Sequence, residues 1–308
     1  MKDLISINDF SSQELRDLFD ISMSLKANPF NDILSQRSMA MIFEKPSLRT
    51  RATFEIGMTQ LGGHALYLQP QDIKLGERES VADVARNLER WVDIIMARTF
   101  LHQTIIDLAK NASIPVINAL SDIEHPCQAL ADFLTILEHK KSFDGLKLAF
   151  VGDGNNVCHS LMILSAKLGV SFSLACPQGY EPMEQIVSLT QELMNQTGAE
   201  FNISEDVNDA VSGADAIYTD VWVSMGQETE TADRKKLFAP YQVNSSVVSV
   251  AKSDVIVMHC LPAHRGEEIT DEVIDGPHSV VFDQAENRLH AQKAVIIKLL
   301  KKEHLIKE

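Results

Sequence analysis

Apolar residues recur along this 308-residue chain in two alternating patterns. Short apolar runs, typical of buried strands, are followed by longer stretches with an apolar residue every three or four positions, typical of helices. A helix comes first, because Ser11 and Glu14 have the spacing of a capping box. Behind this cap runs an apolar stripe of Leu15, Leu18, Phe19 and Leu25.

Four strand–helix units follow this first helix. The apolar runs predict strands at 39–43, 65–68, 94–97 and 115–119, and the periodic stretches predict helices at 48–61, 80–91, 103–112 and 126–139. Such an alternation is typical of a mostly parallel sheet that is covered by helices on both faces.

A second array begins after Lys140 and Lys141, a charged joint where we expect a domain boundary. Gly169 and Gly198 stand where two of its helices should end. We expect strands at 146–151, 171–176, 216–220, 255–259 and 280–283, and helices at 157–168, 183–197, 205–212 and about 285–303. The fold class is therefore predicted as α/β, with two doubly wound parallel-sheet domains. Ligands of such sheets bind beyond the carboxyl ends of the strands.

The charge balance limits the partners. The chain has 43 Asp and Glu against 28 Lys and Arg, a formal net charge of -15. This surface repels phosphate backbones and anionic lipids, so we expect no nucleic-acid and no membrane partner. Any anionic ligand must be bound by a local basic cluster.

The compartment is inferred from what the sequence lacks. The first ten residues include Asp3 and Asp9, and no charge-free run is apolar enough to span a bilayer. The four cysteines have neither the spacing of a zinc site nor the setting of a small disulfide-bonded scaffold. We therefore expect a reduced, cytoplasmic protein with no metal.

The first candidate site is the passage from a strand into a helix at 43–51. Pro46 suits the first helical turn, where unpaired N–H groups attract an anion. Ser47 and Thr50 add hydroxyl groups, and Arg49 offers a fork that matches phosphate or carboxylate. The alternative is a capped helix with solvated arginines.

Two more candidates lie in the same half of the chain. Arg98 directly follows an apolar strand, where it is either an anion ligand or a charge at the rim. His125 opens a helix, and the helix dipole disfavours its cationic form. A neutral imidazole can donate a hydrogen bond to a carbonyl oxygen, although His125 is equally well explained as a simple cap.

The second half contains a misleading pattern. Gly152 and Gly154 follow a strand and open a helix, as in dinucleotide-binding proteins. Val157 replaces the third glycine, and the next strand ends at Cys176 rather than at an acidic residue. We therefore expect no nicotinamide cofactor, and we interpret Asn155 and Asn156 as side chains facing a ligand.

Three further residues are candidates by position. Asp220 ends a strand, where a carboxylate can bind a substrate ammonium group or cap a turn. Cys260 also follows a strand, although a cysteine there is most often a small buried apolar residue. Arg288 lies in the first turn of the predicted last helix and, taken alone, is an ordinary surface charge.

Together these segments resemble the aspartate/ornithine carbamoyltransferase family, and its ornithine-type branch in particular. The resemblance runs from the first helix to Arg288. The runs 47–50 and 125–128 resemble the carbamoyl-phosphate motifs of the whole family, and the runs 220–228 and 259–262 resemble the ornithine-type motifs.

The resemblance implies a role for each site residue. The catalytic residues would be Arg98, His125 and Cys260. Ornithine would be bound by Asn156, Asp220, Ser224 and Met225. Carbamoyl phosphate would be bound by Ser47, Leu48, Arg49, Thr50, Arg98, His125, Gln128, Cys260, Leu261 and Arg288.

The resemblance also implies a domain arrangement. Residues 1–140 would form a carbamoyl-phosphate-binding domain, onto which a final helix at about 288–308 packs. Residues 141–308 would form an ornithine-binding domain, with the active site in the cleft between the two. A homotrimer is implied, with a loop of the neighbouring subunit near Lys74 reaching the site. The family usually has Thr where this chain has Leu48.

The implied reaction is carbamoyl transfer to the δ-amine of ornithine through a tetrahedral intermediate. It yields citrulline and phosphate, belongs to arginine metabolism and needs no cofactor. One alternative is a related transferase that acts on aspartate, putrescine or an acylated ornithine. The other is a non-catalytic amino-acid-binding α/β protein.

Overall fold

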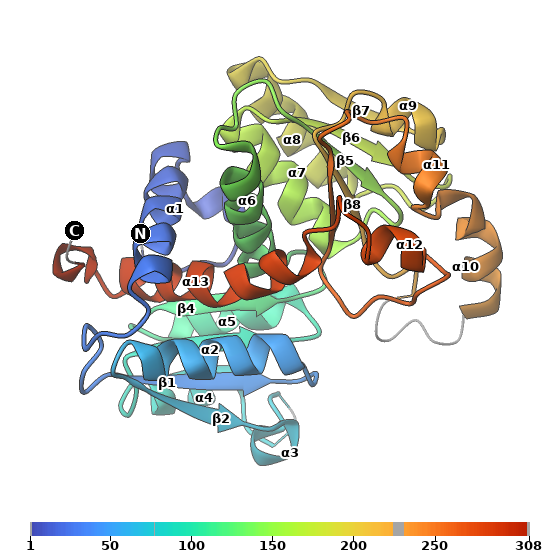
Figure 1. Cartoon of the computed structure of the whole chain (residues 1–308). Coiled ribbons are helices and arrows are strands. Elements are labelled where there is room, and N and C mark those ends of the chain that lie inside the picture. Colours follow the sequence, from blue (N-terminus) through green and yellow to red (C-terminus); the bar gives the residue numbers. More distant parts are fainter. Residues whose placement is uncertain (1, 77, 224–230, 307–308) are drawn as a thin grey trace. The chain divides into compact units, whose positions relative to one another are not determined.

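The computed structural model describes residues 2–76, 78–223 and 231–306 (Figure 1). The chain forms two compact units. Unit 1 comprises the described residues up to Leu134 and from Glu286 onward, and unit 2 comprises those from Thr135 to Ala285. Both boundaries fall within helices, α6 (Pro126–Lys140) and α13 (Val281–Leu299).

Unit 1 contains a four-stranded parallel sheet in the order β2-β1-β3-β4. Met39 of β1, for example, lies opposite Ala65 of β2 and Ile94 of β3. The strands predicted in this half of the chain are confirmed, with bounds β1 (Ser38–Phe43), β2 (His64–Leu68), β3 (Ile94–Arg98) and β4 (Val116–Leu120).

Helices cover both faces of this sheet. Alternate side chains of a strand point to opposite faces. Ala40 and Ile42 of β1 therefore share one apolar cluster with α4 and α5, whereas α2 lies on the other face in Figure 1. The helices of unit 1 besides α6 and α13 are η1 (Ile7–Asp9), α1 (Ser12–Ala27), α2 (Leu48–Gln60), α3 (Pro70–Ile73), α4 (Val81–Leu88), α5 (His102–Asn111) and η4 (Glu303–Leu305).

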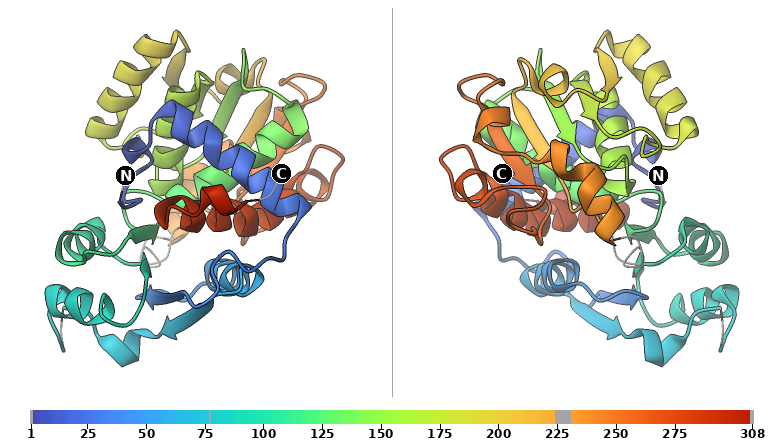
Figure 2. Two further views of the ribbon diagram at one scale, coloured as in Figure 1. Left: turned by 90° about the vertical axis from the view of Figure 1, so that its left-hand side faces the viewer. Right: turned by 90° about the vertical axis from the view of Figure 1, so that its right-hand side faces the viewer.

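The first and last long helices of the chain, α1 and α13, lie side by side in unit 1 (Figure 2). The predicted capping box begins α1: Ser11 Oγ accepts a hydrogen bond from Glu14 N at 3.2 Å, and Glu14 Oε2 accepts from Ser11 N at 2.9 Å. Lys26 Nζ then donates to Asn287 Oδ1 at 2.9 Å. Most of α13, from Glu286 onward, thus belongs to the N-terminal unit.

Unit 2 contains a five-stranded parallel sheet in the order β7-β6-β5-β8-β9. In Figure 1, α7 and α8 lie on one side of it and α9 and α11 on the other. The predicted glycine caps are confirmed, since Gly169 and Gly198 end α7 and α8 with φ of 74° and 77°. The strands are β5 (Lys147–Val151), β6 (Ser171–Ala175), β7 (Phe201–Ser204), β8 (Ala216–Thr219) and β9 (Ile256–His259).

The remaining elements of unit 2 are helices. An apolar cluster on one face of the sheet joins Val151 and Ile217 to Val211 of α9 and Val247 of α11. The helices are α7 (Asn156–Leu168), α8 (Glu184–Thr197), α9 (Val207–Val211), α10 (Thr231–Phe238), η3 (Ala239–Tyr241), α11 (Ser245–Val248) and α12 (Asp271–Ile274). No described helix is long and apolar enough to cross a bilayer.

Two assignments made from the sequence are wrong. The run 280–283 is not a strand: Val280 N donates to Val257 O at 3.0 Å, and the chain then enters α13, which leaves Phe282 71% exposed. A four-residue apolar run fits a strand and a helix start equally well. Strand β7 was missed because it lies at the sheet edge and is only partly buried.

Candidate active site

The candidate residues of unit 1 gather at the carboxyl ends of three neighbouring strands. The segment after β1 leads to Ser47, Arg98 is the last residue of β3, and the loop after β4 ends at His125. The strand order reverses between β1 and β3, because β2 and β4 lie on opposite sides of this pair. Ligands of open α/β sheets bind at such a reversal.

The N-terminus of α2 is one wall of this site. Ser47 is the N-cap, and its hydroxyl accepts a hydrogen bond from Thr50 N at 3.3 Å. Pro46 therefore precedes the cap. The prediction that Pro46 lies in the first helical turn is wrong. Leu48 is the first helical residue and its side chain points outward, with the residue 79% exposed. It can offer a ligand only its backbone N–H.

Two buried arginines converge on Thr50. Arg98 Nη1 lies 3.5 Å and Arg288 Nη2 lies 3.3 Å from Thr50 Oγ1. Arg98 and Arg288 are only 6% and 2% exposed. Guanidinium groups held in this way present planar pairs of donors to a phosphate or carboxylate.

His125 lies beside these positive charges. It directly precedes α6, and its carbonyl oxygen accepts hydrogen bonds from Gln128 N at 3.0 Å and Ala129 N at 3.2 Å. Burial, followed by the charges of Arg288, Arg98 and Arg49, holds the pKa of His125 well below its usual range. The imidazole is therefore neutral, and burial is the largest cause.

Gln128 completes the site on the first turn of α6. Its carbonyl oxygen Oε1 accepts a short hydrogen bond from Arg288 Nη1. Its amide Nε2 donates to Asp132 Oδ1 at 2.8 Å. Gln128 is only 2% exposed, so its amide group has a defined orientation.

The candidate residues of unit 2 are also at the carboxyl ends of three neighbouring strands. Asn155 and Asn156 follow β5, Asp220 follows β8 and Cys260 follows β9. The strand order reverses here too, between β5 and β8. The two units therefore place their candidate residues at the same topological position.

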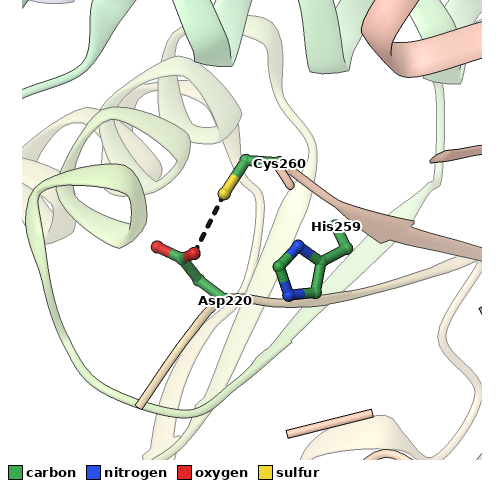
Figure 3. Close-up of side chains that lie close together, drawn as sticks. All are labelled: Asp220, His259 and Cys260. Atoms are coloured by element: carbon green, nitrogen blue, oxygen red, sulfur yellow. Dashed lines mark hydrogen bonds between the residues drawn. The ribbon is translucent and has the colours of Figure 1, made fainter. Parts of the chain in front are cut away.

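Asp220 is the centre of this second group. Its Oδ1 accepts hydrogen bonds from Cys260 Sγ at 3.0 Å and from Val221 N at 2.8 Å, and its Oδ2 accepts from Asn155 Nδ2 at 2.9 Å. Figure 3 shows the thiol of Cys260 directed at Asp220, with the ring of His259 beside them. The carboxylate is 8% exposed, and its donors keep it in place.

His259 supports the turn that carries Cys260. Its Nδ1 accepts a hydrogen bond from Leu261 N at 2.8 Å, so its Nε2 carries the proton that faces Glu268 Oε1 at 3.0 Å. Leu261 has a φ of 57°, a left-handed conformation that is unfavourable for residues other than glycine. Hydrogen bonding within the turn thus supports an unfavourable backbone conformation beside Cys260.

A buried ion pair links the loop after β5 to the segment that follows Asp220. Arg234 forms a salt bridge with Asp153, and Arg234 Nε donates to Trp222 O at 2.7 Å. Next to Asp153, a Cβ atom on Gly154 would lie 2.4 Å from Pro182 N, so only glycine fits. The Gly–Asp–Gly run therefore serves close packing and an ion pair.

Sequence reasoning gave no role to Glu268, Arg234 or Asp132. Each acts through a partner that lies far along the chain or is buried, and no motif signals such partners. Two predicted ornithine ligands, Ser224 and Met225, lie outside the described residues. Cys260 and Leu261, predicted beside the reacting centre, belong to unit 2.

Metal-type ligand atoms lie within 4.8 Å of one another in two groups of the described residues. In the first group, Asp220 and His259 are already engaged in the hydrogen bonds above. The second group consists of His264, Glu267 and Glu268. Lys235 Nζ lies 2.5 Å from Glu267 Oε1, a contact that a cation would displace. The absence of a metal remains a prediction.

Two family models match the chain. The carbamoyl-P binding domain of aspartate/ornithine carbamoyltransferase matches residues 2–138, and the Asp/Orn binding domain matches residues 144–299. The chain belongs to the aspartate/ornithine carbamoyltransferase family. Most of unit 1 corresponds to the first model, and most of unit 2 to the second.

Named relatives support the assignment to this carbamoyltransferase family. Ornithine carbamoyltransferase of Thermococcus kodakarensis is 54% identical over 300 residues, which are 96% of this chain and 95% of the relative. The structure of ornithine carbamoyltransferase from Pyrococcus furiosus is similar with a TM-score of 0.94 and 52% identity, covering 96% of both chains. A structure of acetylornithine transcarbamylase complexed with acetylcitrulline has a TM-score of 0.89 and 30% identity, covering 97% of this chain and 99% of the other.

Proposed function

We propose that this protein is an ornithine carbamoyltransferase, which converts carbamoyl phosphate and L-ornithine to L-citrulline and phosphate. The observation that carries the proposal is the opposite charge of the two groups of residues. Arginines surround a neutral histidine in the unit that matches a carbamoyl-phosphate-binding domain, and a buried carboxylate lies in the unit that matches an Asp/Orn-binding domain.

Carbamoyl phosphate is the ligand of unit 1. The phosphate binds to the N-terminus of α2, through Ser47, Leu48 N–H, Arg49 and Thr50, with Arg98 and Arg288 beside it. Arg98, His125 and Thr50 donate to the carbamoyl oxygen, and Gln128 accepts from the carbamoyl amide. The low pKa of His125 suits this role. The neutral imidazole keeps one N–H group, which can donate to the carbamoyl oxygen, and lacks the second, acidic proton of the cation.

Ornithine is the ligand of unit 2. Asp220 accepts from the α-ammonium group, and Asn156, Ser224 and Met225 bind the rest of the amino acid. Cys260 and Leu261 lie beside the reacting centre. In the structure the thiol of Cys260 donates to Asp220 at 3.0 Å, so Cys260 acts as a protonated positioning group.

The transfer is a direct displacement. The neutral δ-amine attacks the carbamoyl carbon and forms a tetrahedral intermediate with an oxyanion on the former carbonyl oxygen. The carbon–oxygen bond then breaks, and the leaving phosphate takes up the proton that the attacking nitrogen releases. Positioned donors stabilise the developing charge, and no covalent enzyme intermediate is needed. Arg98 and His125 supply these donors.

Asp220 also bears on the choice of amine. An acylated ornithine lacks the α-ammonium group that the carboxylate accepts from, and aspartate would bring extra negative charge toward it. Putrescine offers no carboxylate for the remaining ligands. The lower identity to the acetylornithine enzyme, 30% against 52% for the ornithine enzyme of P. furiosus, agrees with free ornithine as substrate.

The remaining assignments follow from family membership and composition. We propose a cytoplasmic homotrimer that acts in arginine metabolism without a cofactor, with the loop near Lys74 contributing to a neighbouring subunit's site. Each subunit supplies residues 1–140 to carbamoyl-phosphate binding and residues 141–308 to ornithine binding, with helix α13 returning to the first domain.

The test is the identity of the carbamoylated product. Purified protein is mixed with carbamoyl phosphate and, separately, with ornithine, N-acetylornithine, putrescine and aspartate. We expect citrulline from ornithine at a rate at least 100-fold above that of any other amine. A different preferred amine would indicate a related transferase, and no product from any amine would favour a binding protein.

A further inference from the structure

An amide side chain can recognise the NH2 end of a carbamoyl group only in one of its two orientations. The carbamoyl NH2 group is a donor, so Gln128 must present its carbonyl oxygen Oε1 and not its own NH2. The two ends of a glutamine side chain have nearly the same shape, so packing alone does not select between them. Some group in unit 1 must therefore fix the orientation. This requirement rests on the proposed function.

The structure shows such a group behind Gln128. Asp132 lies one helical turn further along α6, is fully buried, and accepts from Gln128 Nε2 at 2.8 Å. On the other side, Arg288 donates to Gln128 Oε1. The amide thus lies between an acceptor and a donor.

An ionised carboxylate accepts hydrogen bonds and donates none. Flipping the amide of Gln128 would place its Oε1 against the carboxylate of Asp132 and its NH2 against the guanidinium of Arg288. Both contacts would be repulsive, and at a buried site such contacts are costly. The carbonyl oxygen has two lone pairs, so it can accept from Arg288 and from the carbamoyl N–H at once.

We propose that Asp132 is a positioning residue, which fixes the amide of Gln128 with its carbonyl oxygen toward carbamoyl phosphate. Asp132 itself touches no substrate. Its effect is on the preference for ligands that carry a carbamoyl amide over ligands that carry phosphate alone.

Asp132→Asn tests this role, because asparagine keeps the shape but can donate to Gln128 Oε1 and so permits the flipped amide. Two stable probes are titrated calorimetrically: phosphonoacetamide, in which a methylene replaces the bridging oxygen of carbamoyl phosphate, and inorganic phosphate. We expect the Kd of phosphonoacetamide to rise about tenfold, the effect of one lost hydrogen bond, and that of inorganic phosphate to stay within about twofold.

The chain offers a matched control. Gln103 Nε2 donates to Asp107 Oδ1 at 2.9 Å on the exposed surface of α5, with the same spacing of four residues. Asp107→Asn should leave the Kd of both probes unchanged. Gln128→Ala should lose the preference for phosphonoacetamide, and adding Asp132→Asn to it should change that preference no further.

A general loss of structure is distinguished by the ratio of the two Kd values. If Asp132→Asn weakens both probes equally, or weakens neither, the inference is wrong. If Asp132→Asn does not fold, Asp132→Ser is titrated in its place with the same expected loss of preference. Wild-type protein that forms no citrulline contradicts the proposed function, whereas an active wild type and an unchanged probe preference in Asp132→Asn contradict this inference alone.

Discussion

Unit 1 and unit 2 build groups of opposite charge at the same structural position. In each, functional side chains follow three neighbouring parallel strands where the strand order reverses. In unit 1 the charges of Arg49, Arg98 and Arg288 act on a neutral His125. In unit 2 a buried carboxylate, Asp220, accepts from three donors.

This difference shows that the loops after the strands, and not the sheet, determine the ligand. It also explains how a chain with a net charge of -15 binds a phosphate-bearing anion. Buried arginines and the helix N-terminus make a local positive site within an acidic protein. The carboxylate of unit 2 suits the cationic amino acid.

We expect the largest effect from a substitution that removes a positive charge of unit 1. Arg98→Ala should lower kcat by about 100-fold or more, because in the proposed mechanism Arg98 stabilises the developing oxyanion. Steady-state kinetics measure this change. Arg86→Ala, which removes an exposed arginine of α4, is the control and should leave kcat unchanged. Turnover of Arg98→Ala near that of wild type would remove Arg98 from the catalytic residues.

The matching change in unit 2 is Asp220→Asn. It removes the charge that we propose accepts from the α-ammonium group, so kcat/KM for ornithine should fall by about 30-fold, the effect of one hydrogen bond between charged groups. Asp254→Asn alters an exposed carboxylate of the same unit and should have no such effect. An unchanged kcat/KM for ornithine in Asp220→Asn would show that ornithine does not bind there.

These two variants also show what the sequence predicts and what it does not. Arg98 and Asp220 are recognisable because each stands at the end of an apolar strand, and this position follows from hydrophobic pattern alone. The sequence pattern does not show which of the other candidates these two residues contact. Thr50 and Arg288 lie 48 and 190 residues from Arg98, and only the folded unit brings the three together.

The same reasoning explains the errors in the fold. Apolar runs predict buried strands well, but β7 (Phe201–Ser204) is an edge strand that is only partly buried, so its pattern is weak. The run 280–283 is apolar because Val281 enters the core of unit 2 from a helix. Burial alone does not reveal which backbone conformation buries a short run.

The pH dependence of kcat/KM for ornithine shows whether the δ-amine of the substrate or His125 of the site titrates. The δ-amine of ornithine has a pKa of about 10.4 by analogy with lysine, so kcat/KM for ornithine should rise about tenfold per pH unit from pH 6 to 8. His125 does not titrate in this range, because its pKa is well below the usual value. A pH profile of wild type that levels off above a pKa near 6.5 would contradict this assignment.

His125 should make the protein less stable in acid. Its pKa is lowered in the folded state, so below about pH 6.5 the unfolded chain binds a proton that the folded protein does not. Stability present above that pH is therefore lost as pH falls. Between pH 6.5 and 5.5, the unfolding free energy of His125→Gln should therefore fall less than that of wild type. Urea denaturation measures this difference, and equal pH slopes would contradict the lowered pKa.

The smallest expected effect concerns Leu48, where the family usually has Thr. The side chain points outward, so only the backbone N–H of this residue faces a ligand. Leu48→Thr should change KM for carbamoyl phosphate by less than about twofold, since no new hydroxyl reaches the phosphate. A tenfold decrease in KM would instead show that this hydroxyl binds phosphate.

The central claim is that carbamoyl phosphate is bound mainly by unit 1 and ornithine mainly by unit 2, and one measurement tests it most directly. Phosphonoacetamide is titrated calorimetrically into wild type, Arg98→Ala and Asp220→Asn. We predict a Kd at least about tenfold weaker in Arg98→Ala and within about twofold of wild type in Asp220→Asn. Equal losses in both variants, or a loss confined to Asp220→Asn, would contradict the account.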